Sequence, residues 1–233
     1  MVVHLLCALL TGFYIYLSPP GTDLFSWHPV CMAVAFSLLS LQAILIFSPL
    51  SSLTPSSPRA DKVQLHWIFQ SFSLLALLAG ASAVYLNKEI HGKKHFTTWH
   101  GRFGLATFAG FLLAFLGGVL ANYSVRFRNL VKPIKLKMYH ATLGMLVFFL
   151  AMSTLYLATH SNFFTNRIKT PWISRAVGLA PIVLGICIAR QVTKSYLPRV
   201  LTPRESEIDS RNKRIEEKIK TKLERKNVNQ RGL

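Results

Sequence analysis

The stretch Lys135-Leu-Lys-Met-Tyr-His-Ala-Thr-Leu-Gly144 leads from a basic loop through a tyrosine directly into an apolar run. His140 stands at the start of that run, and Gly144 lies about one helical turn further in. An ionisable side chain at the edge of a long hydrophobic segment is energetically costly and marks a candidate functional site. Three more histidines stand at the edge of an apolar run: His28, His66 and His100. The runs behind these four histidines decide the fold.

The composition combines two properties that rarely occur together. The 233-residue chain is 51% hydrophobic, and its formal net charge is +18. The charged residues lie mainly between the apolar runs and in the tail. Only Asp23, Asp61 and Glu89 are acidic before residue 198. A basic balance can indicate nucleic-acid binding, but long apolar runs between charged loops are typical of a protein embedded in membrane lipid. We therefore expect membrane lipid, and no nucleic acid, as a partner.

Six apolar runs organise the chain, and they cover residues 2–17, 28–47, 63–86, 99–121, 138–160 and 173–192. A helix needs about 17–25 such residues to cross a bilayer, so the first run is slightly short. A cleaved signal peptide is the alternative for that run, but it has no basic lead-in, and residues 18–21 form a turn rather than a cleavage site. We predict an all-α integral membrane protein, a six-transmembrane-helix bundle over residues 1–197, and a basic, partly disordered tail at 198–233.

The charges outside the runs give the orientation of the bundle. An even number of spans places both termini on the same side of the membrane. Lys and Arg are balanced between the loops of the two sides, so Arg190, Lys194, Arg199 and the tail decide the orientation. Because cytoplasmic segments retain an excess of Lys and Arg, both termini are predicted to be cytoplasmic.

The alternating direction of the spans sorts the four histidines by depth. His28 and His100 follow non-cytoplasmic loops, whereas His66 and His140 follow cytoplasmic loops. The two predicted pairs are therefore separated by a hydrocarbon core about 30 Å thick, which no pair of side chains can bridge. The nearly equal spacing within the pairs is consistent with duplication of a two-span unit.

Two facing imidazoles on neighbouring helices suit the two axial positions of a haem iron. A tetrahedral metal site needs four converging ligands, and these pairs cannot converge. Gly101, Gly104 and Gly144 would leave room for a flat macrocycle, although close helix packing is the usual role of glycine in membrane helices. The alternative is that each histidine is an ordinary interfacial residue without a metal.

The sequence resembles the cytochrome b561 family, and most closely its short eukaryotic members, the cytochrome b561 domain-containing proteins. The resemblance extends roughly over residues 1–195. It rests on residues 24–30 (Leu-Phe-Ser-Trp-His-Pro-Val), 46–53 (Ile-Phe-Ser-Pro-Leu-Ser-Ser-Leu), 66–67, 100–101 and 135–144. It implies a six-helix bundle whose central four helices hold two haem b groups. His28 and His100 would ligate the non-cytoplasmic haem iron, and His66 and His140 the cytoplasmic one.

The resemblance also implies an oxidoreductase that takes electrons from cytoplasmic ascorbate. The acceptor across the membrane would be monodehydroascorbate or a ferric chelate. Candidate ascorbate contacts are Lys62, Lys135 and Lys137, whose alternative explanation is the positive-inside bias. Candidate acceptor contacts are Lys88, His91, His95 and Arg102, and the two histidines would also suit a metal if they lie on a helix. Asn87 stands near the position where classical members carry a histidine for the acceptor, which leaves the acceptor open.

Other classes of function have weaker support. A proton-coupled carrier needs carboxylates along its path, and none of the six runs contains Asp or Glu. No nucleophile–base pair or phosphate loop is present, so no catalytic side chains are predicted. A haem-containing redox sensor and a non-catalytic membrane scaffold remain alternatives. The resemblance favours an endomembrane location, in the endoplasmic reticulum or cytoplasmic vesicles, and permits a homodimer.

Overall fold

A computed structural model describes residues 2–48, 51–201, 211 and 214–217, and every regular element in that part of the chain is a helix. One compact unit comprises Met1–Gln191, and a second begins at Val192. The helices in order are α1 (Val2–Leu17), α2 (Trp27–Met32), η1 (Ala33–Ser40), α3 (Leu41–Leu45), α4 (Arg59–Ile90), α5 (Trp99–Asn122), α6 (Pro133–Ala158), α7 (Asn162–Arg167) and α8 (Pro171–Leu201). The predicted tail at residues 198–233 lies largely outside the described residues.

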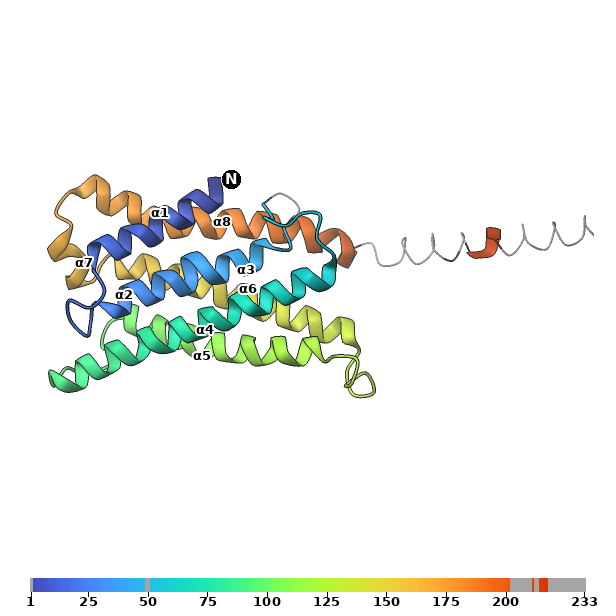
Figure 1. The fold of residues 1–233 in the computed structure, drawn as a ribbon, viewed down its shortest axis with the longest axis horizontal. Helices are drawn as coiled ribbons and strands as arrows, with labels where there is room; N and C mark the ends of the chain where they lie inside the picture. The colour runs from blue at the N-terminus through green and yellow to red at the C-terminus, as the bar shows by residue number, and fades with distance from the viewer. Residues whose placement is uncertain (1, 49–50, 202–210, 212–213, 218–233) are drawn as a thin grey trace, which may run out of the picture. The chain divides into compact units, whose positions relative to one another are not determined.

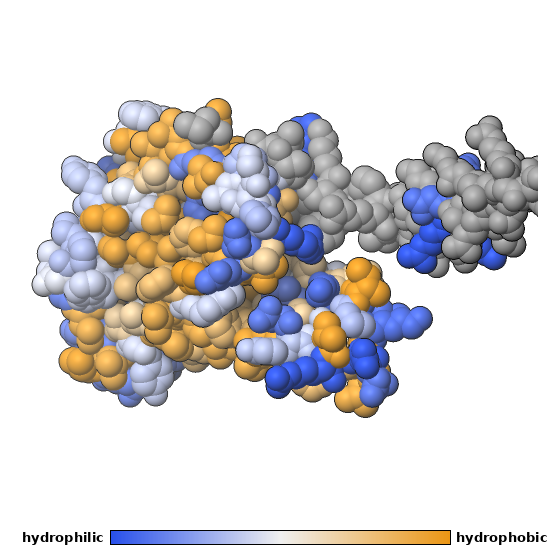
Figure 2. Space-filling model, turned by 45° about the vertical axis from the view of Figure 1, so that its right-hand side comes forward, coloured by the Kyte–Doolittle hydropathy of each residue, from blue (hydrophilic) through white to orange (hydrophobic). Residues whose placement is uncertain are grey.

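Five stretches of helix in the described part are long and apolar enough to cross a membrane: Trp27–Leu45, Arg59–Ile90, Trp99–Asn122, Pro133–Ala158 and Pro171–Gln191. Many of their apolar side chains face outward, as Leu113 and Leu116 do with 60% exposure each, and Figure 2 shows hydrophobic residues over much of the visible face. Such a surface is suited to lipid and not to water. The predicted all-α membrane fold is therefore confirmed. The count of six spans stays a prediction, because α1 has only 16 residues.

Successive long helices run in opposite directions, so the turns gather at the two ends of the bundle (Figure 1). The turns after α3 and α5 lie at one end, and those after α1 and α4 lie at the other. The continuous α2–η1–α3 segment packs mainly against α4, and we call these the first helix pair. α5 packs mainly against α6, and we call these the second helix pair. Within the described residues α1 packs on η1, and α8 approaches α6 at Gly178 and Gly185.

Two helix starts show how short polar signals position the histidines. Thr98 has an extended backbone, and its hydroxyl accepts a hydrogen bond from the backbone N–H of Gly101 at 3.2 Å, which caps α5. α6 begins with Pro133, whose missing N–H is tolerated in a first turn. His100 is therefore fixed in the first turn of α5, and His140 lies two turns into α6.

The second predicted run is not a uniform α-helix. Its middle, η1, is a π-helix of eight residues, Ala33–Ser40, between the α-helical turns of α2 and α3. The buried Ser37 hydroxyl donates to the Ala33 carbonyl oxygen at 2.5 Å and also bonds to Thr11 at 2.9 Å. A side chain that competes for a helical carbonyl in this way favours a local departure from α geometry. The apolar pattern of residues 28–47 gave no sign of this change.

Several helices extend beyond their apolar runs. α4 begins four residues before the predicted run and continues to Ile90, with Asp61 in its first turn and Lys88 in its last. An acidic residue in the first turn and a basic residue in the last turn interact favourably with the helix macrodipole. The helix therefore extends beyond both ends of its apolar run. α6 likewise begins at Pro133, which makes Lys135 and Lys137 helical rather than loop residues. The loop predicted at residues 161–172 contains the short helix α7, whose start is capped by Ser161.

Candidate functional site

His28 and His100 face each other across the gap between the two helix pairs. Each is the second residue of its helix, His28 on α2 and His100 on α5, and each follows a tryptophan. Their ring centres are 6.1 Å apart, and the ring planes are inclined at 79°. We call them the His28–His100 pair.

His66 and His140 form a second pair with almost the same geometry. Each is the eighth residue of its helix, His66 on α4 and His140 on α6. Their ring centres are 6.2 Å apart, and the planes are inclined at 86°. The structure thus brings the four histidines together in the two combinations that the alternating spans predict. Their role as haem ligands stays a prediction.

Each of the four rings is also held by a hydrogen bond from Nδ1 to a backbone carbonyl oxygen of the other helix in its own helix pair. The bonds are His28 to Gly80 at 3.0 Å, His66 to Ala43 at 2.9 Å, His100 to Thr154 at 3.1 Å and His140 to Ala114 at 3.1 Å. Because a carbonyl oxygen only accepts, Nδ1 carries the proton and the lone pair lies on Nε2. Among the described residues no Nε2 of the four has a hydrogen-bond partner, so all four are free to ligate a metal.

The spacing of the rings fits a haem iron held between two imidazoles. A metal–nitrogen bond of about 2 Å on each side, plus about 1 Å from each nitrogen to its ring centre, places two axial imidazole centres about 6 Å apart. The two observed separations, 6.1 and 6.2 Å, agree with that value. The described residues contain no cluster of three or more His, Cys, Asp or Glu that would hold a metal by protein ligands alone. The donor set therefore suits a group that supplies its own equatorial ligands.

Two of the three glycines predicted to make room for a macrocycle lie beside open space. Gly104 and Gly144 each stand four residues after a histidine, on the same helix face. A Cβ atom at Gly144 would meet nothing within 4 Å, and one at Gly104 would touch only Thr154, at 3.8 Å. Gly101 differs, because a Cβ there would lie 3.3 Å from the Cα of Phe96. Its role is the close approach of the preceding loop, not room beside a ring.

The carbonyl partners follow a common register. Gly80 follows His66 by 14 residues, and Thr154 follows His140 by 14. Ala114 also follows His100 by 14, whereas Ala43 follows His28 by 15. The extra residue falls in the segment that contains η1, where a π-turn takes up one more residue than an α-turn. The second helix pair therefore repeats the first, as the histidine spacing had indicated.

The four acceptor-side candidates do not form one cluster. The Lys88 ammonium donates to the carbonyl oxygen of Lys94 at 2.9 Å, and Arg102 Nε donates to that of Phe96 at 3.3 Å. His95 bonds to Glu89 at 2.7 Å and stacks on Tyr85. These contacts brace the loop between α4 and α5. Lys88 stands in the last turn of α4, the helix that precedes the loop leading to His100.

His91 stands apart from the other acceptor-side candidates, because its Nδ1 bonds to the backbone oxygen of Asn87 at 2.7 Å. α4 ends at Ile90, and the residues that lead to His95 are not helical. His91 and His95 therefore do not share a helix, which was the condition under which they would suit a metal ion.

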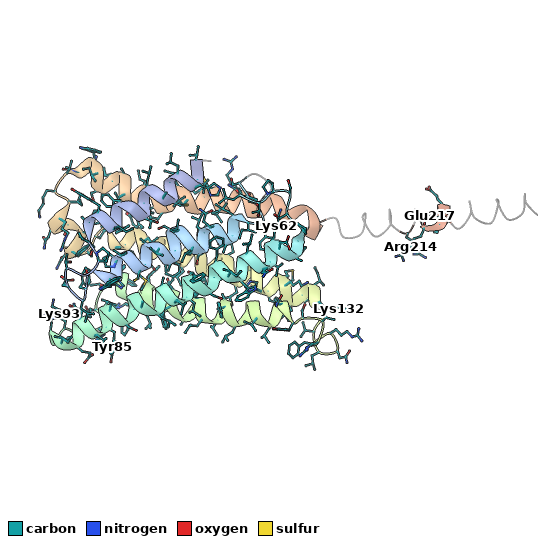
Figure 3. The ribbon with its side chains drawn as sticks, in the orientation of Figure 1. Lys62, Tyr85, Lys93, Lys132, Arg214 and Glu217 are labelled. Carbon is teal, nitrogen blue, oxygen red and sulfur yellow. The ribbon has the colours of Figure 1, made fainter. Side chains whose placement is uncertain are left out.

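The three lysines predicted to meet the donor lie at the end of the bundle near the His66–His140 pair. Figure 3 labels Lys62 and Lys132 toward this end and Tyr85 and Lys93 at the other. The Lys62 ammonium donates to the Pro55 carbonyl oxygen at 2.9 Å. Lys135 and Lys137 are exposed, and their side chains have no hydrogen bond or ion pair among the described residues.

Sequence reasoning missed the contacts that fix the rings and the layer between them. The carbonyl groups of Ala43, Gly80, Ala114 and Thr154 belong to the backbone, so no side-chain type announces them. The buried rings of Phe36 on η1 and Phe111 on α5 meet edge to face, with centres 5.8 Å apart, and join the two helix pairs between the histidine levels. The 14-residue register between histidine and carbonyl became visible only once the structure had identified the partners.

Comparison with known proteins gives consistent similarities. The family model described as eukaryotic cytochrome b561 matches residues 27–165. Transmembrane reductase CYB561D2 of Bos taurus is 40% identical over 197 residues, which cover 84% of this chain and 87% of the bovine protein. The Mus musculus protein named probable transmembrane reductase CYB561D1 is 36% identical over 203 residues, covering 85% and 86% of the two chains.

Proposed function

The chain belongs to the eukaryotic cytochrome b561 family, and we propose that it is a transmembrane reductase that passes electrons across the membrane through two b-type haems. The proposal rests on two separate imidazole pairs at different depths of one helix bundle. In each pair the ring centres are about as far apart as those of two imidazoles that ligate one haem iron. A single pair would suit storage or sensing. Two pairs in one bundle form a route from one membrane surface to the other.

In this proposal each residue has a defined task. His28 and His100 hold one haem, and His66 and His140 hold the other. When bound, haem iron supplies the one-electron couple that the protein side chains lack. The four backbone carbonyls orient the imidazoles, so that little rearrangement accompanies a change of charge. The packed helix pairs, with Phe36 against Phe111 between the two levels, would give this route an apolar interior.

We assign the end with the His66–His140 pair to the cytoplasm and to the donor, and we take ascorbate as that donor. Ascorbate is an anion, and it becomes monodehydroascorbate when it loses one electron and a proton. The ammonium groups of Lys135 and Lys137 are exposed and have no hydrogen bond or ion pair within the part of the chain that the structure describes. They support this assignment, because they would attract an anion to the edge of the cytoplasmic site. Lys62 would contribute after release of its bond to Pro55.

We assign the opposite end to the acceptor, which takes up one electron as monodehydroascorbate or as a ferric chelate. Lys88 supports this assignment, because its ammonium group stands in the last turn of α4 at this end of the bundle and would attract an anion. An anionic acceptor beside it would therefore lie close to the reduced centre. Arg102 and His95 would hold the loop that shapes this site, and His91 stands at its exposed edge.

Reconstitution of the purified full-length protein in liposomes tests the proposal. We expect two haems per chain in a reduced-minus-oxidised spectrum, reduction by external ascorbate, and re-oxidation by ferricyanide trapped inside the vesicles. A protein that binds haem but leaves the trapped ferricyanide oxidised would be a sensor rather than a reductase. A protein without haem would be neither, and a scaffold role would then remain.

A further inference from the structure

We propose that Gly118 of α5 is a positioning residue for His140, and this inference rests on the proposed haem-binding function. The absence of a side chain at this position lets the imidazole lie directly against the α5 backbone. From there Nδ1 reaches the Ala114 carbonyl oxygen at 3.1 Å, and the ring centre lies 6.2 Å from that of His66. A side chain of even one carbon would displace the ring from that position.

The distances around Gly118 show how closely the ring approaches. A Cβ atom built at Gly118 would lie 3.0 Å from His140 Cε1 and 3.5 Å from both Nδ1 and Nε2. It would therefore press on the edge of the ring that carries both nitrogens. A contact of 3.0 Å is tolerated only if the neighbouring atom can move by a few tenths of an ångström.

His140 cannot yield in this way when both of its nitrogens are engaged. Cε1 lies between Nδ1, which donates to Ala114 at 3.1 Å, and Nε2, the atom available to a metal. A shift of Cε1 away from α5 must lengthen the Nδ1 bond or move Nε2 out of the position from which it would ligate a metal. The Ala114 carbonyl oxygen also accepts the intrahelical hydrogen bond from the Gly118 N–H. The imidazole of His140 therefore lies against the single turn of α5 that links these two residues.

The neighbouring glycines provide matched comparisons on the same helix. A Cβ at Gly117 would lie 3.8 Å from His140 Nδ1, which is an ordinary van der Waals contact. A Cβ at Gly110 would lie 2.9 Å from Val147 Cγ2, so it would strain the packing of α5 on α6 without touching a histidine. Of these three positions, only Gly118 would bring an added Cβ into tight contact with a candidate haem ligand, His140.

Helix propensity works in the opposite direction to the predicted effect. Alanine is a much better helix former than glycine, so Gly→Ala changes within a helix ordinarily stabilise it. A site that weakens in Gly118→Ala while the helix persists would therefore reveal the contact with His140 rather than a general loss of structure.

The experiment compares full-length Gly118→Ala, Gly117→Ala and Gly110→Ala proteins with the parent protein. We expect Gly118→Ala to lose at least half of the low-spin haem signal assigned to the His66–His140 pair, or to shift its midpoint potential and electron paramagnetic resonance g-values. The signal of the other haem should be unchanged. Gly117→Ala should keep both signals, and Gly110→Ala should change both alike or neither. Unchanged spectra in Gly118→Ala, or equal changes in the Gly117→Ala protein, would overturn the inference.

A second readout does not need haem and separates this inference from the proposed function. In ¹⁵N-histidine-labelled apoprotein, the Nδ1–H signal of His140 is assigned by its absence from the His140→Gln protein. Gly118→Ala should make that proton exchange faster with water, and Gly117→Ala should not. If the parent protein binds no haem, the proposed function fails. If the exchange rates of the two alanine variants are equal, the positioning role of Gly118 fails.

Discussion

The two helix pairs make the same site with different backbones. In the second pair both helices are regular, and each carbonyl acceptor lies 14 residues beyond a histidine. In the first pair one spacing is 15 residues, and the π-helix η1 takes up the difference. The two imidazole separations nevertheless differ by only 0.1 Å. The comparison teaches that ring position, and not helix regularity, is the property the fold retains.

The pairs also differ in the residue that lies one helical turn beyond each histidine. In the second pair this residue is glycine, Gly104 or Gly144, and in the first it is Met32 or Gln70. The second pair therefore leaves space at these positions, whereas in the first pair Met32 approaches Gly80 and Gln70 accepts a hydrogen bond from Ser40. Glycine in the first pair has another purpose, because a Cβ at Gly80 would lie 2.8 Å from Cys31 Cβ. There the missing side chain allows close contact between helices.

Single replacement of a ligand should have the largest effect. His100→Gln and His140→Gln should each halve the haem content, because each removes one axial ligand from a different pair. Haem quantification and low-spin resonance signals would measure this, with His160→Gln as a control outside both pairs. Loss of both haems from either variant, in protein with an unchanged helical circular dichroism spectrum, would contradict the independence of the pairs.

Single-residue deletions test the difference between the π-helix and the α-helix. Deletion of Leu38 from η1 should give a regular helix with a 14-residue register, and both haems should be retained. Deletion of Leu112 from α5 should turn the rest of that helix through about 100°. The Ala114 carbonyl would then leave His140, and one haem should be lost. Equal haem loss in the two deletion variants would show that η1 does not compensate for an extra residue.

Filling the open space beside His140 should have a smaller but local effect. Gly144→Leu should lower the haem occupancy of the His66–His140 pair several-fold and spare the other pair. Gly12→Leu is the matched control, because a Cβ at Gly12 also meets nothing within 4 Å but Gly12 lies on α1, away from any histidine pair. Titration of the apoprotein with haem would report both occupancies. Full occupancy in Gly144→Leu would show that the macrocycle lies elsewhere.

Charge removal at the two ends should have the smallest effect. The double variant Lys135→Gln, Lys137→Gln should slow reduction by ascorbate about 3–10-fold at low ionic strength, because it weakens electrostatic attraction of the anion. Haem spectra should be unchanged, and the difference should shrink as salt is added. Lys93→Gln, at the opposite end, should leave the ascorbate rate unchanged. A salt-independent rate in the double variant would argue against steering by these lysines.

The helices and the histidine pairs were predictable because both depend on side-chain type. Apolar runs locate helices, and alternating spans sort His28 with His100 and His66 with His140. Backbone geometry was not predictable in the same way. The π-turns at Ala33–Ser40 depend on a carbonyl shared with Ser37, and the ring partners are main-chain groups. Gly118 was missed because glycines in membrane helices are common, and only the position of the His140 ring distinguishes it from Gly117.

The apolar layer marked by Phe36 and Phe111 has an electrical consequence. The histidine-bearing helices carry no Asp, Glu, Lys or Arg within residues 29–45, 67–87, 103–122 and 138–158. Electrons can tunnel through such an apolar layer, but protons find no Asp, Glu, Lys or Arg within these segments to follow. Each electron that crosses therefore moves an uncompensated charge through the membrane. A voltage of 100 mV across the full bilayer changes the free energy of that transfer by about 2.3 kcal/mol. The membrane voltage then joins the redox potentials of donor and acceptor in setting the direction of electron flow.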